Sequence, residues 1–257
     1  MIEKHIDIPT ADGRMDSFVV HPEEGGLFPA VVVLMDIWGL REELFDIARR
    51  VASVGYHVTL PNFWYRRGKV RFEYRDDNGR MRSLLALPKD VQDELHANMV
   101  QVTDRMAMAD IGAVLKFLGG EPVRNGPKGT IGYCLGGRLS LAAAAEFPDQ
   151  FRASASMHGT RLVNDKPDSP HRFVGKMRGE IYCGFAETDD LAPPATIETL
   201  AKLFAGCNQV KYRAMVHPAN GLPSPGILPA VHHDLRRQGA SRAYWRRFGG
   251  DVRHEHV

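Results

Sequence analysis

The chain has 257 residues, of which 44% are hydrophobic and 25% charged, with 33 Lys+Arg against 31 Asp+Glu. This apolar content is enough to offset the entropy of ordering and excludes an intrinsically disordered chain. A formal net charge of +2 is too balanced for nucleic acid to be the main partner. The three cysteines form no C-x-x-C pair and no zinc spacing, and their odd number fits a reducing compartment. No targeting or membrane-spanning segment is visible, and we expect a cytoplasmic protein.

Hydrophobic patterning predicts an alternation of strands and helices along the whole chain. Apolar runs predict strands over 15–20, 30–35, 56–60, 129–133, 153–157, 180–185 and 210–216. Apolar residues at helical spacing predict helices over 41–54, 89–118, 137–147, 194–205 and 238–248. The pattern predicts an α/β fold with a doubly wound, mostly parallel sheet, formed by residues 1–257 as one domain. Residues 62–88 are polar and rich in Arg, Tyr and Trp, and they predict a long excursion or lid.

One motif lies at the carboxyl end of a predicted strand, where parallel sheets of this type have their active sites. The sequence Gly132-Tyr133-Cys134-Leu135-Gly136 follows a predicted strand and precedes an Ala-rich helix. This is the context of a nucleophile elbow, whose sharp turn leaves room only for glycine on either side of the nucleophile. We expect Cys134 to be the nucleophile, with thiolate favoured by the helix N-terminus, and the Leu135 amide to bind an oxyanion. The other two cysteines have no matching motif and are expected to be structural.

The loop after the early strand 30–35 is a second candidate segment, Asp36-Ile37-Trp38-Gly39. In α/β hydrolases this loop provides the other oxyanion donor, for which the Ile37 amide is the candidate. Trp38 is expected beside the site. Asp36 either touches the nucleophile, where its charge would raise the thiol pKa, or serves as a turn or cap residue.

The loop after the predicted strand 180–185 contains several acidic residues. A triad acid belongs after the nucleophile and before the base in chain order, which places it here. Its role is to hold the tautomer of the catalytic imidazole and to stabilise the imidazolium. Asp189 is the first candidate, with Glu187 and Asp190 as alternatives, and capping of the following helix is the structural explanation.

Together these segments resemble the dienelactone hydrolase family of α/β hydrolases. The similarity includes GYCLGGR (132–138), the loop 35–39, AETDDLAPP (186–194), GYHVTLPNFWYR (55–66) with Asn62 where the family has Asp, and Met157-His158-Gly159. It extends from about residue 29 to 248. The resemblance implies cofactor-free hydrolysis of a small carboxylic ester or lactone through a thiol acyl-enzyme.

The sequence departs from the family at the expected base. Where the family has histidine after the last strand, this chain has Asn220, and asparagine does not exchange a proton at neutral pH. Three alternatives stay open: His217 is the base, His232 or His233 is the base, or the triad is broken. In the last case the protein is weakly active or is a non-catalytic binding or regulatory protein. A thiol-dependent redox protein is a weaker alternative, because no resolving cysteine is near Cys134.

The remaining candidates concern binding. Arg66, in the excursion, is a candidate for binding a substrate carboxylate through its bidentate guanidinium. His158 is expected to be a hydrogen-bonded structural histidine, and no histidine spacing predicts a metal site. We therefore expect a small-molecule substrate, no cofactor or metal, no nucleic-acid or membrane partner, and a chain compatible with a homo-oligomer.

Overall fold

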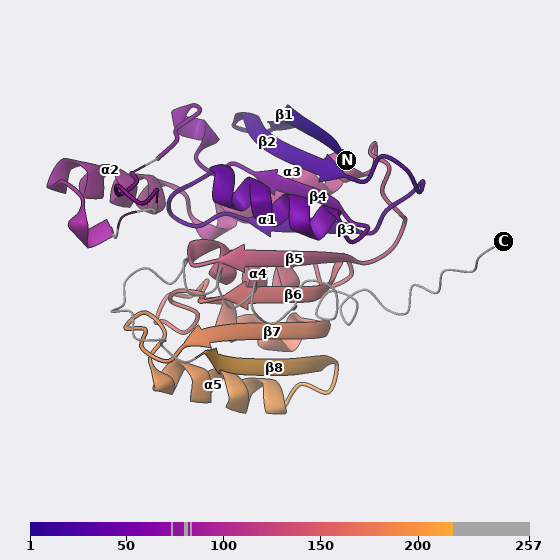
Figure 1. Ribbon diagram of the computed structural model, residues 1–257. Helices are drawn as coiled ribbons and strands as arrows, with labels where there is room; N and C mark the ends of the chain where they lie inside the picture. Colours follow the sequence, from indigo (N-terminus) through magenta and orange to yellow (C-terminus); the bar gives the residue numbers. More distant parts are fainter. Residues whose placement is uncertain (73, 80–81, 83, 218–257) are drawn as a thin grey trace.

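The part of the chain that the structure describes is built on one eight-stranded sheet with the strand order β1-β2-β4-β3-β5-β6-β7-β8 (Figure 1). The computed structural model describes residues 1–72, 74–79, 82 and 84–217. The β1–β2 and β2–β4 pairs are antiparallel, and the pairs from β4 to β8 are parallel. The strands are β1 (Ile2–Thr10), β2 (Gly13–His21), β3 (Ala30–Leu34), β4 (His57–Pro61), β5 (Lys128–Tyr133), β6 (Phe151–Met157), β7 (Gly179–Ala186) and β8 (Val210–His217).

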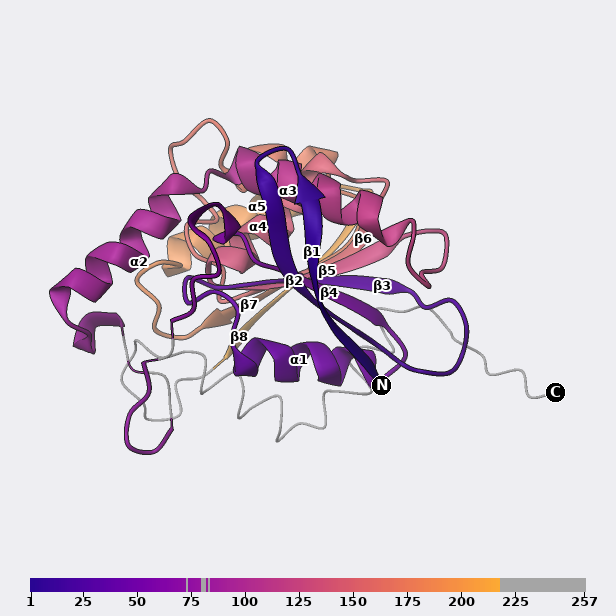
Figure 2. The ribbon, with the colours of Figure 1, turned by 90° about the horizontal axis from the view of Figure 1, so that it is seen from above.

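Helices cover both faces of this sheet (Figure 2). They are α1 (Glu42–Ala52), α2 (Lys89–Gln101), α3 (Asp104–Leu118), α4 (Leu135–Glu146) and α5 (Pro194–Ala205). Helix α1 lies on one face, and α3, α4 and α5 lie on the other. All five residues of β3 are buried, as expected of a continuous apolar strand between two helical layers. The predicted α/β fold with a mostly parallel sheet is confirmed.

The structure adds elements that hydrophobic patterning did not predict. Strand β1 is half exposed, and its IEKHIDIPT sequence lacks a clear apolar alternation because it is an edge strand. The predicted helix 89–118 is two helices: α2 ends at Gln101, and Thr103 caps α3 by accepting a hydrogen bond from the Met106 amide. A 3₁₀ segment, Pro170–Lys176, also precedes β7. The helix predicted over 238–248 lies outside the described residues.

The excursion after β4 continues into helix α2. It contains two short 3₁₀ turns, Tyr65–Arg67 and Leu84–Ala86. In both ribbon views α2 projects beyond the edge of the sheet at which the parallel strands end (Figures 1 and 2). The excursion therefore overhangs the edge where an active site of this fold lies. In the described part of the chain, no helix is both long and apolar enough to span a bilayer.

Candidate active site

Cys134 forms a sharp turn between the central strand β5 and helix α4. Its backbone has φ 54° and ψ −112°, in the left-handed half of conformational space that non-glycine residues avoid. Backbone strain of this kind costs about 1–3 kcal/mol and persists only where the surroundings enforce it. A Cβ on Gly132 would overlap the Gly136 carbonyl oxygen, and a Cβ on Gly136 would overlap the Leu34 carbonyl oxygen. The glycines of the motif are thus required by close backbone approach, as the sequence predicts.

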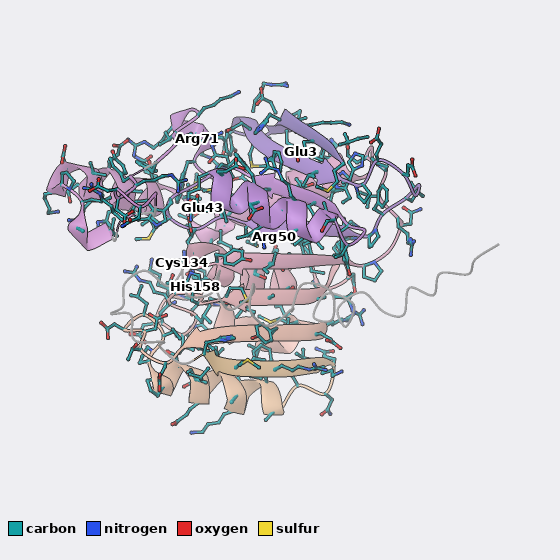
Figure 3. All side chains as sticks on the ribbon, viewed as in Figure 1. Glu3, Glu43, Arg50, Arg71, Cys134 and His158 are labelled. Atoms are coloured by element: carbon teal, nitrogen blue, oxygen red, sulfur yellow. The ribbon has the colours of Figure 1, made fainter. Side chains whose placement is uncertain are left out.

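Hydrogen bonds hold the elbow to the loop that follows β6. The Cys134 amide donates to the Met157 carbonyl at 3.0 Å, and the Thr160 amide donates to the Cys134 carbonyl at 3.2 Å. The sulfur is hydrogen-bonded by the Leu135 amide and by the Thr160 hydroxyl. Figure 3 shows Cys134 and His158 at the ends of the neighbouring strands β5 and β6. The thiol therefore lies at the carboxyl edge of the sheet with donors around it.

The charge state of the thiol differs from the sequence expectation. Burial, with a further contribution from the charges of Asp36 and Asp189, raises the pKa of Cys134 from 9.0 to about 12. The Leu135 amide and Thr160 hydroxyl act in the opposite direction but do not compensate. The helix N-terminus is expected from the sequence to favour thiolate, whereas burial and the two carboxylates favour the neutral thiol at this site. A raised pKa favours the neutral thiol over the thiolate at neutral pH.

Asp36, in the loop after β3, is held in a buried ion pair. Its two carboxylate oxygens accept bonds from Arg41 Nη1 and Nη2, each at 2.7 Å, and both side chains are almost fully buried. One of these oxygens also accepts the Trp38 amide at 2.9 Å. Asp36 therefore serves as a turn residue and acts on the thiol through its charge. Trp38 itself is buried in the main hydrophobic core.

The two amides predicted to bind an oxyanion have different environments. The Leu135 amide begins the first turn of α4 and lowers the pKa of the Cys134 thiol. Among the described residues, the Ile37 N–H has no hydrogen-bond partner. An amide without a protein partner in a turn beside the nucleophile is what an oxyanion donor requires. The pairing of Ile37 with Leu135 stays a prediction.

Asp189 lies in the loop between β7 and α5. Its Oδ1 accepts the Leu191 amide at 2.9 Å, and its carbonyl accepts the Ala192 amide at 3.1 Å. Burial raises the pKa of Asp189, the Leu191 amide lowers it, and the charge of Asp190 raises it. Because its charge also acts on the Cys134 thiol, Asp189 belongs to the same edge of the sheet. Its role as triad acid stays a prediction.

His217 is the last described residue and ends β8. It is opposite Ala186 of β7, and its Nε2 lies 3.3 Å from the Tyr182 hydroxyl. Its ring therefore packs beside the outer part of the sheet. The other sequence candidates for the base, His232 and His233, and the departure at Asn220 lie outside the described residues. The identity of the base stays a prediction.

His158 differs from the expectation of a satisfied structural histidine. It is 6% exposed, has φ 40°, and its amide donates to the Gly184 carbonyl at 2.7 Å. Its buried Nδ1 has no hydrogen-bond partner among the described residues. Burial lowers the pKa of His158 to about 4, with Asp36 opposing and Arg41 reinforcing the shift. The imidazole is neutral and its Nδ1 is unpaired, beside the elbow.

Arg66 is engaged by the protein itself. It bonds Asp110 through Nη1 and Nη2 at 2.8 and 2.9 Å, and it bonds Asp12 through Nε and Nη2 at 2.8 and 2.6 Å. Its guanidinium also lies 4.5 Å from the Tyr65 ring centroid. These bonds anchor the start of the excursion to the first hairpin and to α3. A substrate role for Arg66 stays a prediction that would require these carboxylates to release it.

The sequence analysis missed two residues of the site. Thr160, whose hydroxyl bonds the nucleophile, follows β6 by three positions, and its location after a strand end was the available signal. Arg41 was counted as the first residue of a helix, yet it is the buried partner of Asp36. An arginine five residues after a strand-end aspartate gives no sign of burial in the sequence alone. Asn62 is also structural, and its Nδ2 donates to Asp16 at 2.8 Å.

The sequence and fold of this chain are similar to those of known proteins. The sequence profile of the dienelactone hydrolase family matches residues 15–221. The chain belongs to the dienelactone hydrolase family. A Methylorubrum extorquens protein assigned as a carboxymethylenebutenolidase is 28% identical over 255 residues, covering 95% of this chain and 82% of the relative. An Escherichia coli K12 protein of the same assignment is 26% identical, covering 95% and 86%.

Solved structures agree with the fold of this dienelactone hydrolase family member. A crystal structure from Klebsiella pneumoniae, assigned as a dienelactone hydrolase, has a TM-score of 0.74 at 21% identity and covers 96% of each chain. The dienelactone hydrolase from Anabaena variabilis has a TM-score of 0.62 at 16% identity, covering 95% of this chain and 97% of the other. At these identities the likeness establishes the α/β-hydrolase fold. Family membership makes the chain a hydrolase.

Proposed function

We propose that this protein hydrolyses a small carboxylic ester or lactone through a thioester on Cys134. The observation that carries the proposal is the elbow: a strained cysteine at the end of the central strand, with the Leu135 amide and Thr160 hydroxyl bonded to its sulfur. The relatives assigned as carboxymethylenebutenolidases support a lactone-type substrate. No metal or cofactor is needed for this chemistry.

The reaction has two balanced steps. In the first, the Cys134 sulfur loses its proton to a base and bonds to the carbonyl carbon, and the carbon–oxygen bond to the leaving group breaks. The leaving oxygen takes the proton. In the second, water attacks the thioester, the carbon–sulfur bond breaks, and the thiol regains a proton. The amides of Ile37 and Leu135 bind the oxyanion in both steps.

A neutral resting thiol makes the base the critical partner. His217 is the candidate from the sequence, with Asp189 as the acid that orients it. His158 is a second candidate, because its neutral ring has an unpaired Nδ1 beside the elbow. If neither serves, the departure at Asn220 favours the alternative function, a catalytically impaired or non-catalytic binding protein on the same fold.

The test uses the full chain with an activated aryl ester and a small lactone. We expect an acyl adduct on Cys134 by mass spectrometry and loss of turnover in Cys134→Ala. Cys207→Ser, at a partly exposed cysteine after α5, is the control and should keep full activity. Equal hydrolysis by the wild type and Cys134→Ala would refute the thioester route. An adduct that forms but is not hydrolysed would favour the impaired-triad alternative.

The base is assigned by three variants compared at several pH values. His217→Gln and His158→Gln each test one candidate, and the variant of the true base should lose about 10²-fold or more in kcat. A large gain from Asn220→His would instead favour a native site that lacks its base. Unchanged kcat in both histidine variants would remove His217 and His158 from the mechanism.

A further inference from the structure

A cluster of two histidines and one glutamate lies away from the nucleophile. His21 ends β2, His57 begins β4, and Glu121 follows α3. One ligand atom from each residue lies within 4.8 Å of the other two. Strand β1 starts opposite His21, and this end of the sheet, marked N in Figure 1, is opposite the edge that carries Cys134 in Figure 3.

The two histidines are brought together by sheet register. In the β2–β4 ladder Val20 is opposite Val58, so the next step outward sets His21 against His57. Their rings stack with centroids 5.3 Å apart and an interplanar angle of 11°. Cross-strand neighbours of this kind hold their side chains in fixed proximity. Two imidazoles from rigid strands are therefore held close together without any ligand.

His21 is held in the tautomer that binds metal. Its Nδ1 lies 2.7 Å from the Pro22 carbonyl oxygen. A carbonyl only accepts, so Nδ1 carries the hydrogen, and in the neutral ring the lone pair is on Nε2. That Nε2 is buried and has no hydrogen-bond partner within the described residues. A histidine whose other nitrogen donates to a backbone carbonyl is the usual arrangement of a metal ligand.

The spacing of the other pair fits a metal better than a direct hydrogen bond. His57 Nε2 lies 3.4 Å from Glu121 Oε2, which is long for an N–H···O bond. Two atoms bound to one tetrahedral zinc at about 2.0–2.1 Å lie roughly 3.3–3.4 Å apart. His57 is fully buried, whereas Glu121 is 18% exposed and gives the cluster access to solvent.

We propose that His21, His57 and Glu121 bind one divalent cation of the zinc class, with water as a further ligand. Two neutral imidazoles and a carboxylate are a donor set that Zn²⁺ and Co²⁺ accept. The ion ties β2, β4 and the segment after α3 together at the end of the sheet away from the elbow. Its role is structural, and it is independent of the proposed ester hydrolysis.

The test begins with the full chain freed of metal by a chelator. Co²⁺ should bind with one equivalent and give the intense visible bands of a tetrahedral ion, without the thiolate charge-transfer band that a cysteine ligand would add. Zn²⁺ should displace Co²⁺ and raise the thermal midpoint. Glu121→Gln keeps the side-chain shape at a partly exposed position, and it should weaken binding by at least about tenfold and abolish the visible bands. His57→Gln should do the same.

One control variant and one charge variant separate this site from adventitious binding. His96→Gln, at an exposed position of α2, should leave the affinity unchanged. Lys4→Ala should tighten binding at low salt, because the positive charge of Lys4 acts on His57. The proposal would be overturned if the wild type did not bind one equivalent of Co²⁺. It would also be overturned if Glu121→Gln and His57→Gln bound Co²⁺ as tightly as the wild type. Ester hydrolysis should be the same with and without chelator.

Discussion

The resting state of the nucleophile can be tested by alkylation. The pKa of Cys134 is about 12, against 9.0 for the same thiol in water. At any pH well below 9, this difference lowers the thiolate fraction by a factor of about 10³. A thiolate whose thiol has a higher pKa is more nucleophilic, with a Brønsted slope of about 0.4–0.5. Over about three pKa units this slope raises the rate constant of the thiolate roughly 15- to 30-fold. The net expectation is that Cys134 reacts about 30- to 70-fold more slowly than a solvated cysteine.

The assay is reaction with iodoacetamide followed by mass spectrometry of each cysteine peptide. The rate at Cys134 is compared with that of a short cysteine peptide, from pH 6 to pH 10. Since the pKa lies above this range, the rate should rise about tenfold per pH unit and reach no plateau. Thr160→Val removes a hydrogen bond that lowers the thiol pKa, so it should slow the reaction further.

A plateau with a midpoint below pH 8 would refute the reasoning. It would mean that the helix N-terminus of α4 outweighs burial and the two carboxylates, as the sequence alone suggests. A uniform slowing with an ordinary midpoint would indicate steric shielding instead. The shape of the pH profile therefore separates electrostatics from access.

Three further predictions concern stability, measured by urea unfolding. Cys134→Gly relieves the left-handed strain and should be more stable than Cys134→Ala by about 1 kcal/mol. As a control, Ala201→Gly within helix α5 should lower the stability by about 1 kcal/mol. A Cys134→Gly variant that is less stable than Cys134→Ala would contradict the strain argument. His158 has a folded pKa of about 4 against 6.5 unfolded, so stability should fall by at most about 3 kcal/mol as pH drops from 6.5 to 4. His158→Gln should remove that part of the slope, and an unchanged slope would argue against a buried neutral ring. Arg41→Met leaves Asp36 buried and unpaired and should cost about 3–5 kcal/mol, so a near-neutral result would mean that Asp36 becomes protonated or hydrated.

Local signals in the sequence were sufficient for the fold and the elbow. The strand ends and the glycines around Cys134 depend on neighbours within a few positions, and the structure has them where the pattern predicts. The pKa of Cys134 was not predictable in the same way, because it depends on burial and on charges from other loops. Strand β1 was missed because an edge strand need not alternate.

The metal-type cluster shows the same limit more sharply. His21, His57 and Glu121 are separated by 36 and 64 positions, so no spacing rule connects them. The absence of a metal motif in the sequence therefore carried no information about this site. Only the pairing of β2 with β4, and the return of the chain after α3, bring the three residues together.

The high thiol pKa also changes what the departure at Asn220 means. An enzyme whose cysteine is already a thiolate needs a base mainly to activate water in the second step. With a pKa of about 12, only about one molecule in 10⁵ is thiolate at pH 7, so attack also depends on proton removal. A missing base would then slow both steps. We expect the pH–rate profile of the first step, followed as adduct formation, to show the pKa of the assisting imidazole if His217 or His158 serves. If no imidazole serves, adduct formation should instead rise steadily to pH 10, in parallel with alkylation of Cys134.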